Sequence, residues 1–338
     1  MLQLALVAER RLEWREAARP ELTGSKSAIV RPVAVAVCDF DRWVVSGRYR
    51  SLRHPVAVGH EIAAEVVEVG SDVKRVKVGD RVVLPLHISC GTCPSCSGGR
   101  TNSCVSRPPL SNYGLGPVGG DWGGGMSDFL CVPYADAMAA RIPDGLTAAQ
   151  CAASGCNLVD MYRTIAPHVA RYEKPSVLLV SGQAYNMALY GIVIARALGI
   201  ERVDFLDDDS ARLAAAEQLG ARPVQLSQRP YDLHPIVVDC GGDASRIAAA
   251  LMRVGPDGVC TSVLPYEGPM PLPVNAMFQR NATFVTGQPH AAHLLEPVLE
   301  LVRLGKFNSL SIPVEVLPWK EADGKFGFGD TKRIFIRD

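Results

Sequence analysis

The sequence lacks an excess of charge of either sign. Lys and Arg together number 35, and Asp and Glu together number 35, so no net field attracts a nucleic acid or an anionic membrane surface. It also lacks a long hydrophobic run, because no stretch approaches the about eighteen apolar residues of a membrane-spanning helix. The N-terminal segment MLQLALVAERRLEW becomes charged after eight residues, unlike a signal peptide. We therefore expect a cytoplasmic protein with neither nucleic acid nor membrane as a partner.

The chain has 338 residues, of which 48% are hydrophobic and 21% charged. This length favours two domains, each large enough to bury a core without disulfides. In a reducing compartment, clustered cysteines are more often metal ligands than disulfides. Six of the ten cysteines are scattered singly, and each by itself is expected to pack as a small apolar residue. These six are Cys38, Cys131, Cys151, Cys156, Cys240 and Cys260.

The other four cysteines lie in one short segment, SCGTCPSCSGGRTNSC. Cys90, Cys93, Cys96 and Cys104 are spaced so that four thiolates on one Gly-rich lobe can close a tetrahedral zinc site without an open position. Such a site is structural. An iron–sulfur cluster is the rival interpretation, but a ferredoxin-like run has a shorter last gap and a following proline, and Val105 follows here. Disulfides or free thiols remain further alternatives.

The character of the sequence changes near residue 150. The first part is β-rich, with short apolar runs such as KSAIVRPVAVAVC, a strand predicted at 81–84, and a Gly- and Pro-rich loop at 105–126. After residue 150, buried-strand patterns alternate with helical patterns, which predicts a doubly wound parallel sheet. Strands are expected at 176–182, 201–209, 234–242 and 257–264, and helices at 187–199, 210–221 and 245–255. A helix at 294–305 and a strand at 332–338 follow.

The segment VSGQAYNMALYG stands between the first of these strands and its helix. A dinucleotide-binding turn needs small residues there, so that backbone N–H groups can approach a pyrophosphate. Gly-x-Gly-x-x-Gly is absent, and Gly182, Ala184 and Ala188 are the small residues in its place. Asp207 follows 25 residues after Gly182, where a carboxylate can accept hydrogen bonds from ribose and repel a 2′-phosphate. We expect a dinucleotide site that prefers NAD(H) to NADP(H).

A second set of metal-ligand residues is dispersed, with Cys38 in CDFDRW and His60-Glu61 in GHEIAAEVVEVGSDV. With VGDRVV and the four-cysteine lobe, these segments make the sequence resemble the zinc-dependent medium-chain alcohol dehydrogenases over nearly the whole chain. CDFDRWVVSGRY and GGDWGGGMSDFLCVPYAD are most similar to the glucose dehydrogenase-like branch. The resemblance implies an α/β protein with a GroES-like β-rich catalytic domain, a Rossmann-like nucleotide domain, and an active site in the cleft.

The resemblance also implies roles for individual residues. Cys38, His60 and Cys156 match the ligands of a catalytic zinc, which keeps a fourth position for water or substrate. Glu61 matches an alternate ligand, and Asp41 matches the acid that orients the ligand histidine. The implied activity is hydride transfer between NAD(H) and a small alcohol or carbonyl substrate, with two zinc ions per chain.

Two residues depart from the family pattern. Phe40 occupies the position of a Ser or Thr that passes the alcohol proton toward solvent, and Asp160 stands where a small hydroxyl residue is common. Either Asp160 or Glu61 carries the proton, or the reaction needs no relay. The alternatives are therefore a reductase of an activated C=C or C=N bond, and a catalytically inactive nucleotide-binding relative.

The implied domain boundaries are 1–150 for the catalytic domain, 151–288 for the nucleotide domain, and 289–338 for a segment that returns to the first. The resemblance further implies a homodimer or homotetramer. Lys332 or Arg333 is a candidate for contact with the cofactor phosphates.

Overall fold

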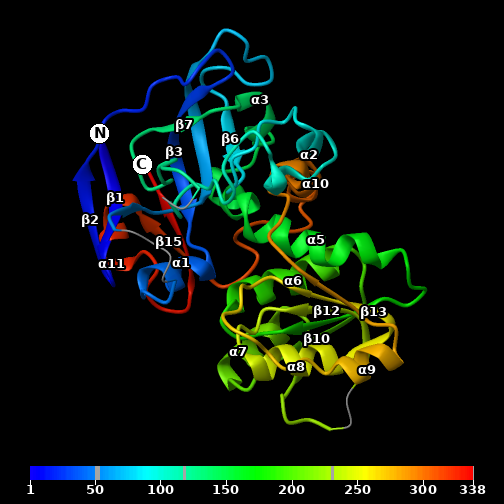
Figure 1. Cartoon of the computed structure of the whole chain (residues 1–338). Coiled ribbons are helices and arrows are strands. Elements are labelled where there is room, and N and C mark those ends of the chain that lie inside the picture. Colours follow the sequence, from blue (N-terminus) through cyan, green and yellow to red (C-terminus); the bar gives the residue numbers. More distant parts are fainter. Residues whose placement is uncertain (50–53, 117–118, 230–231, 338) are drawn as a thin grey trace. The chain divides into compact units, whose positions relative to one another are not determined.

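The computed structural model of the chain describes residues 1–49, 54–116, 119–229 and 232–337, which form two compact units (Figure 1). The first unit comprises Met1–Val159, Pro289–Leu310 and Val314–Asp338, and the second comprises Asp160–Gln288 and Ser311–Pro313. The division falls inside helix α5 (Asn157–Val169), not at residue 150. The residues before it stay with the first unit because they bond to it: Leu86 N donates to Gly155 O at 3.1 Å.

Two sheets form the frame of the first unit. The seven-stranded sheet has the order β15-β16-β3-β5-β6-β8, with β7 also paired to β3, and the three-stranded sheet has the order β2-β1-β4. All neighbouring strands are antiparallel except β15 and β16. The bounds are β1 Leu2–Ala8, β2 Arg11–Glu16, β3 Ala28–Ala36, β4 Val56–Ala57, β5 Glu61–Val69, β6 Arg81–Leu84, β7 Leu130–Val132, β8 Ala140–Arg141, β15 Val314–Pro318 and β16 Lys332–Ile336.

Strand β3 positions the first candidate metal ligand. Its sequence AIVRPVAVA is buried at most positions, and its pairing with β5 shifts register between Pro32 and Ala34, since proline has no N–H for the ladder. Beyond the shift, Ala36 lies opposite Glu61. The residues after β3 and before β5 therefore meet at one end of the pair, and these residues include Cys38 and His60.

Short helices surround this frame. Helix α1 begins directly after Cys38, and α5 begins directly after Cys156, so both scattered candidate cysteines precede helix N-termini. The remaining helical segments of the first unit lie against strands of its sheets, near the cysteine lobe or along the C-terminal segment. The bounds are α1 Asp39–Val45, α2 Pro94–Ser97, η1 Thr101–Ser103, α3 Ala135–Met138, α4 Ala148–Cys151, η2 Ala152–Gly155, α10 Ala291–Arg303, η3 Trp319–Glu321 and α11 Ala322–Lys325.

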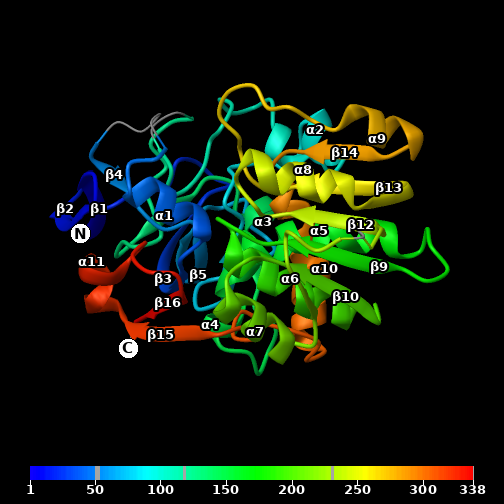
Figure 2. The same ribbon diagram turned by 90° about the horizontal axis from the view of Figure 1, so that it is seen from below.

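The second unit is built on a parallel six-stranded sheet with the order β11-β10-β9-β12-β13-β14, and Figure 2 shows its strands side by side. The order reverses beside β9, and ligands of open α/β sheets bind at such a switch point. The bounds are β9 Ser176–Val180, α6 Tyr185–Ala197, β10 Arg202–Leu206, α7 Ser210–Gln218, β11 Arg222–Val224, β12 His234–Asp239, α8 Ala244–Met252, β13 Val254–Ser262, α9 Val274–Gln279 and β14 Thr283–Thr286.

The fold class predicted from the sequence is confirmed. The expected strand-and-helix alternation of the second unit corresponds to β9, α6, β10, α7, β12, α8 and β13. Strands β11 and β14 were not expected, because they are short and largely exposed and so show no apolar pattern. Within the described ranges, none of the helices combines the length and the apolar character needed to span a bilayer.

Candidate metal centres and nucleotide turn

The four-cysteine lobe brings its sulfur atoms together. The ligand atoms of Cys90, Cys93, Cys96 and Cys104 all lie within 4.8 Å of one another, and all four side chains are buried. Backbone N–H groups point at two of the sulfurs: Cys93 N donates to Cys90 Sγ at 3.3 Å, and Cys90 N donates to Cys104 Sγ at 3.4 Å. All four thiols are free of disulfides. This closed set of four sulfurs fits a structural zinc ion.

The thiols of the lobe differ in their pKa values. Burial opposes ionisation of Cys90, but hydrogen bonds from Ser106, Thr92 and Cys93 lower the pKa of its thiol to about 5. Burial, with the neighbouring sulfurs of Cys93 and Cys104, raises the pKa of Cys96 to about 12. Adjacent thiolates repel one another, so a divalent cation is needed to make all four ionise together.

The dispersed set also converges. Ligand atoms of Cys38, His60 and Cys156 lie within 4.8 Å of one another, although the three residues come from the end of β3, the start of β5 and the end of η2. Their side chains are buried. Hydrogen bonding with Cys156 lowers the pKa of Cys38 well below its usual value, and His60 and Lys332 add to this effect against the cost of burial. Two sulfurs and one imidazole form a donor set typical of a catalytic zinc.

Asp41 joins helix α1 to this cluster. One carboxylate oxygen accepts from Cys38 N at 2.9 Å and so caps the helix, while the Cys38 sulfur accepts from Phe40 N at 3.4 Å. The other oxygen, Oδ1, lies 3.2 Å from His60 Nδ1, and among the described residues neither atom has another hydrogen-bond partner. Burial opposes charging of His60, yet Asp41 raises the pKa of His60 well above its ordinary value. Asp41 therefore faces the ring nitrogen in a way that can fix its orientation.

Glu61 belongs to a buried network that the sequence did not reveal. Its Oε1 accepts from Asn157 N at 2.9 Å, and its Oε2 accepts from Lys332 Nζ. Burial raises the pKa of Glu61 to about 7 against the opposing charge of Lys332. Lys332 Nζ also donates to Asn157 Oδ1 at 2.7 Å, and Asn157 Nδ2 donates to Cys38 Sγ at 3.1 Å.

Either Lys332 or Arg333 was expected from the sequence to contact the cofactor phosphates. Instead, the Lys332 ammonium group is buried against Glu61, and Arg333 pairs with Glu315 at 2.7 Å. The sequence signal for this network is weak. It is an Asn directly after a candidate cysteine ligand, and Asn is common wherever a helix begins.

The two residues that depart from the family pattern lie in different surroundings. The Phe40 ring packs against Tyr49 and Trp43, with ring centroids 5.1 and 6.0 Å apart, and has no polar group. Asp160 belongs to the second unit, and its Oδ1 accepts from Arg163 Nε at 2.6 Å. A proton-relay role for Asp160 stays a prediction.

The nucleotide turn connects β9 to α6 in the second unit. A Cβ at Gly182 would lie 2.2 Å from Gly241 O, so only glycine fits there. Ala184 is the N-cap of α6, and Ala188 is buried within that helix. Counting from Gly182, the third glycine of the usual spacing corresponds to Met187, which is buried. Ala188, the small residue expected in its place, lies one position further along the helix, as the longer spacing in the sequence indicates.

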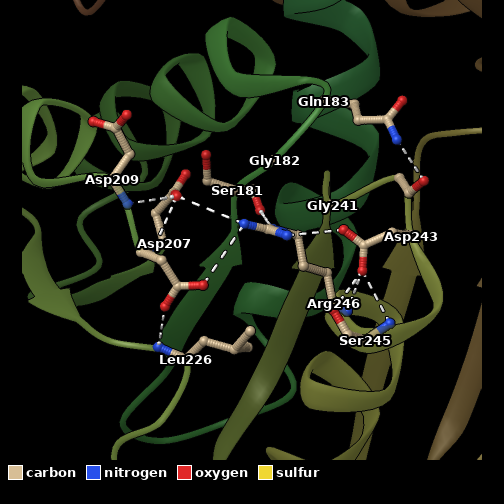
Figure 3. A network of polar contacts seen from close by, with 12 residues as sticks. Ser181, Gly182, Gln183, Asp207, Asp209, Leu226, Gly241, Asp243, Ser245 and Arg246 are labelled. Carbon is tan, nitrogen blue, oxygen red and sulfur yellow. Dashed lines mark hydrogen bonds and ion pairs between the residues drawn. The ribbon is translucent and has the colours of Figure 1, made fainter.

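Charged side chains surround this turn (Figure 3). Asp207 follows β10 and is buried, and its Oδ1 accepts from the backbone N–H groups of Asp208 and Asp209. Its Oδ2 lies 3.6 Å from Arg212 and has no hydrogen-bond partner among the described residues. Arg246 donates to Ser181 O at 3.0 Å and pairs with Asp243 at 2.8 Å, with Asp207 and Asp208 slightly further away.

Comparison with known proteins shows similarity to the alcohol dehydrogenases. Residues 24–144 match the alcohol dehydrogenase GroES-like domain. A probable zinc-binding alcohol dehydrogenase of Mycobacterium tuberculosis is 27% identical over 90% of this chain and 78% of its own length. The alcohol dehydrogenase of Thermus sp. ATN1 superposes with a TM-score of 0.91 at 25% identity, covering 100% of both chains. Together these comparisons show the GroES-like domain and the fold of the alcohol dehydrogenases. The chain is an oxidoreductase, as the sequence motifs predicted.

A glutathione-independent formaldehyde dehydrogenase of Bacillus subtilis is 32% identical over 59% of this chain. The matched region covers 50% of the length of that protein. These likenesses do not single out the glucose dehydrogenase-like branch, which stays a prediction.

Proposed function

We propose that this alcohol dehydrogenase family member interconverts a small alcohol and its carbonyl compound with NAD(H), using a catalytic zinc held by Cys38, His60 and Cys156. A second, structural zinc would be held by Cys90, Cys93, Cys96 and Cys104. The observation that carries the proposal is the meeting of three buried donor atoms, from three distant segments, within 4.8 Å of one another. Buried sulfur and imidazole donors in this number favour zinc with one position left for substrate.

When bound, zinc supplies a Lewis acid for the substrate oxygen, and the nicotinamide supplies or accepts the hydride. The residues of the chain prepare for this chemistry. Asp41 orients the His60 ring, and the capping bonds around Cys38 fix its sulfur at the start of α1. Glu61, an alternate ligand by resemblance, has both carboxylate oxygens engaged by Asn157 and Lys332, which keeps it in one position.

The proposed preference for NAD(H) rests on the charges around the nucleotide turn. Four carboxylates and two guanidinium groups lie there, so the local charge is negative and opposes a 2′-phosphate. These groups belong to Asp207, Asp208, Asp209, Asp243, Arg212 and Arg246. Close packing at Gly182 and the buried Asp207 Oδ2 without a hydrogen bond both fit a dinucleotide. Titration calorimetry should show NADH binding at least about tenfold more tightly than NADPH, and equal affinities would contradict this preference.

Zinc analysis and an alcohol panel test the whole proposal. We expect two zinc ions per chain, one of which is lost in Cys156→Ser, and NADH formation from NAD⁺ with at least one alcohol. A protein with zinc only at the lobe would contradict the catalytic centre. If no alcohol reacts but an unsaturated carbonyl or an iminium compound is reduced, the relay lost at Phe40 marks a C=C or C=N reductase. Two zinc ions with no NADH binding would indicate an inactive relative.

We also propose that the chain forms a homodimer or a homotetramer, as the resemblance implies. Light scattering during size-exclusion chromatography would give the mass of the assembly, and a monomer of 36.3 kDa would contradict the proposal.

A further inference from the structure

Asn157 lies between the candidate metal ligands and a buried ion pair. Its Nδ2 is 3.1 Å from Cys38 Sγ and 3.8 Å from Cys156 Sγ. Its Oδ1 accepts from Lys332 Nζ at 2.7 Å, and its backbone N–H, the first of helix α5, donates to Glu61 Oε1 at 2.9 Å. Both ends of the side-chain amide are therefore engaged within the first unit.

The contact with Lys332 fixes which end of the amide faces the sulfurs. An ammonium group can only donate, so the atom beside it must be the amide oxygen. A flipped amide would place an NH2 group against the ammonium and an oxygen against two sulfurs, leaving both sides repulsive. Lys332 cannot turn away, because its ammonium is fully buried and also pairs with Glu61. The amide N–H groups consequently point at the thiol sulfurs.

The buried ion pair beside Asn157 fixes its amide, and the amide in turn acts on the Cys38 sulfur. Lys332 and Glu61 neutralise each other, and a buried ion pair of this kind persists when further hydrogen bonds satisfy it, as Asn157 does on both sides. An N–H donor withdraws electron density from a thiolate, and groups outside the ligand sphere tune a metal in this way.

We propose that Asn157 is a positioning residue, which donates its amide hydrogen bond to the Cys38 sulfur and thereby sets how much charge that sulfur gives to a bound metal. The inference rests on the proposed catalytic zinc at Cys38, His60 and Cys156.

The proposal can be tested by replacing zinc with cobalt, because the wavelength of the thiolate-to-cobalt charge-transfer bands reports the donor strength of sulfur. If Asn157 had only a structural role, its substitution would leave this wavelength unchanged. Asn157→Asp has the same shape and keeps the acceptor for Lys332, but loses the donor. We expect its bands to shift to longer wavelength. With zinc, its kcat should fall about tenfold to a hundredfold at unchanged zinc content. Asn157→Leu, which also lacks the donor but adds no charge, should shift the bands in the same direction.

Asn112→Asp is the matched control, because Asn112 is a buried asparagine of the same unit that donates to a carbonyl, Leu110 O, at 2.7 Å. Its cobalt spectrum should equal that of the unsubstituted protein. Unshifted bands in both Asn157 variants, or a folded variant that binds no cobalt at this cluster, would overturn the inference. Absence of cobalt from Cys38, His60 and Cys156 in the unsubstituted protein would instead overturn the proposed function itself.

Discussion

The two cysteine clusters reach the same closeness of ligand atoms by different routes. The lobe draws its four sulfurs from one segment of the chain, and the contacts to Cys90 and Cys104 come from backbone N–H groups of that same segment. The Cys38, His60 and Cys156 cluster joins three distant segments and is surrounded by buried side chains such as Asp41 and Asn157. A cluster drawn from one segment can thus take its hydrogen bonds from that segment, whereas a cluster assembled from three segments takes them from side chains of the whole unit.

Loss of the lobe site should have the largest effect, on stability. Cys93→Ser removes one of four ligands, and binding of a structural zinc contributes about 10 kcal/mol or more to folding in small zinc domains. We expect one zinc per chain to be lost and the melting temperature to fall steeply, as measured by metal analysis and calorimetry. Cys131→Ser, a cysteine outside both clusters, is the control. A variant that loses the zinc but melts normally would show that the lobe is not structural.

Loss of a ligand from the dispersed cluster should act on activity instead. We expect Cys156→Ser to lower kcat/KM by about a thousandfold, which corresponds to about 4 kcal/mol, with a melting temperature near that of the unsubstituted protein. The measurement is steady-state kinetics with the best alcohol of the panel. Cys151→Ser, a nearby buried cysteine outside the cluster, should keep its activity. If Cys156→Ser and Cys151→Ser were equally active, the dispersed cluster would not be the catalytic site.

A third buried cluster sharpens the comparison because it contains no thiol. Asp204 in β10 lies 3.1 Å from His234 Nε2 and also pairs with Arg222. Burial opposes the charge of Asp204, but His234 and Arg222 hold its pKa well below the usual range. Breaking such a buried pair costs about 3 kcal/mol. We expect Asp204→Asn to lower the free energy of unfolding by about 3 kcal/mol at pH 7, as measured by urea denaturation. A metal chelator should not change this difference, because the cluster contains no thiol.

The pH dependence of this cluster follows from the direction of its shift. Because the pKa of Asp204 is lower in the folded than in the unfolded chain, its stabilisation is complete above the unfolded value of about 3.9 and is lost as pH falls toward the folded value. The stabilities of Asp204→Asn and the unsubstituted protein should therefore converge only in strong acid. A difference that is unchanged between pH 7 and pH 2 would contradict this account.

The smallest effect is expected from Asp41→Asn. Asn keeps an oxygen that can cap helix α1 but removes the negative charge 3.2 Å from His60 Nδ1. Groups that orient a metal-binding histidine contribute about tenfold to a hundredfold in activity or metal affinity. We expect kcat to fall by this factor while the zinc content and the melting temperature stay near normal. Loss of zinc from the variant would show that Asp41 mainly holds the metal and not the ring orientation.

The sequence predicted the fold class, the family and most of the second unit, because buried parallel strands and their helices have distinct periodic patterns. It also grouped the residues of both clusters, the lobe by spacing and the dispersed set by resemblance. It did not reveal Asn157, and it offered Lys332 as a contact of the cofactor phosphates and not as the partner of Glu61. A single buried Lys in a C-terminal strand looks like a surface residue in sequence, and only its pairing with Glu61 explains its burial.

The amino-acid order by itself determined the lobe and the alternation of strands and helices, because those features depend on neighbours a few residues apart. Only the tertiary structure decided which side chains surround Cys38: strand β3 must pair with β5, and β16 must return beside β3, before Glu61, Asn157 and Lys332 can meet. The physical reason is that contacts between distant segments depend on strand register and packing of the whole unit, which local patterns do not encode.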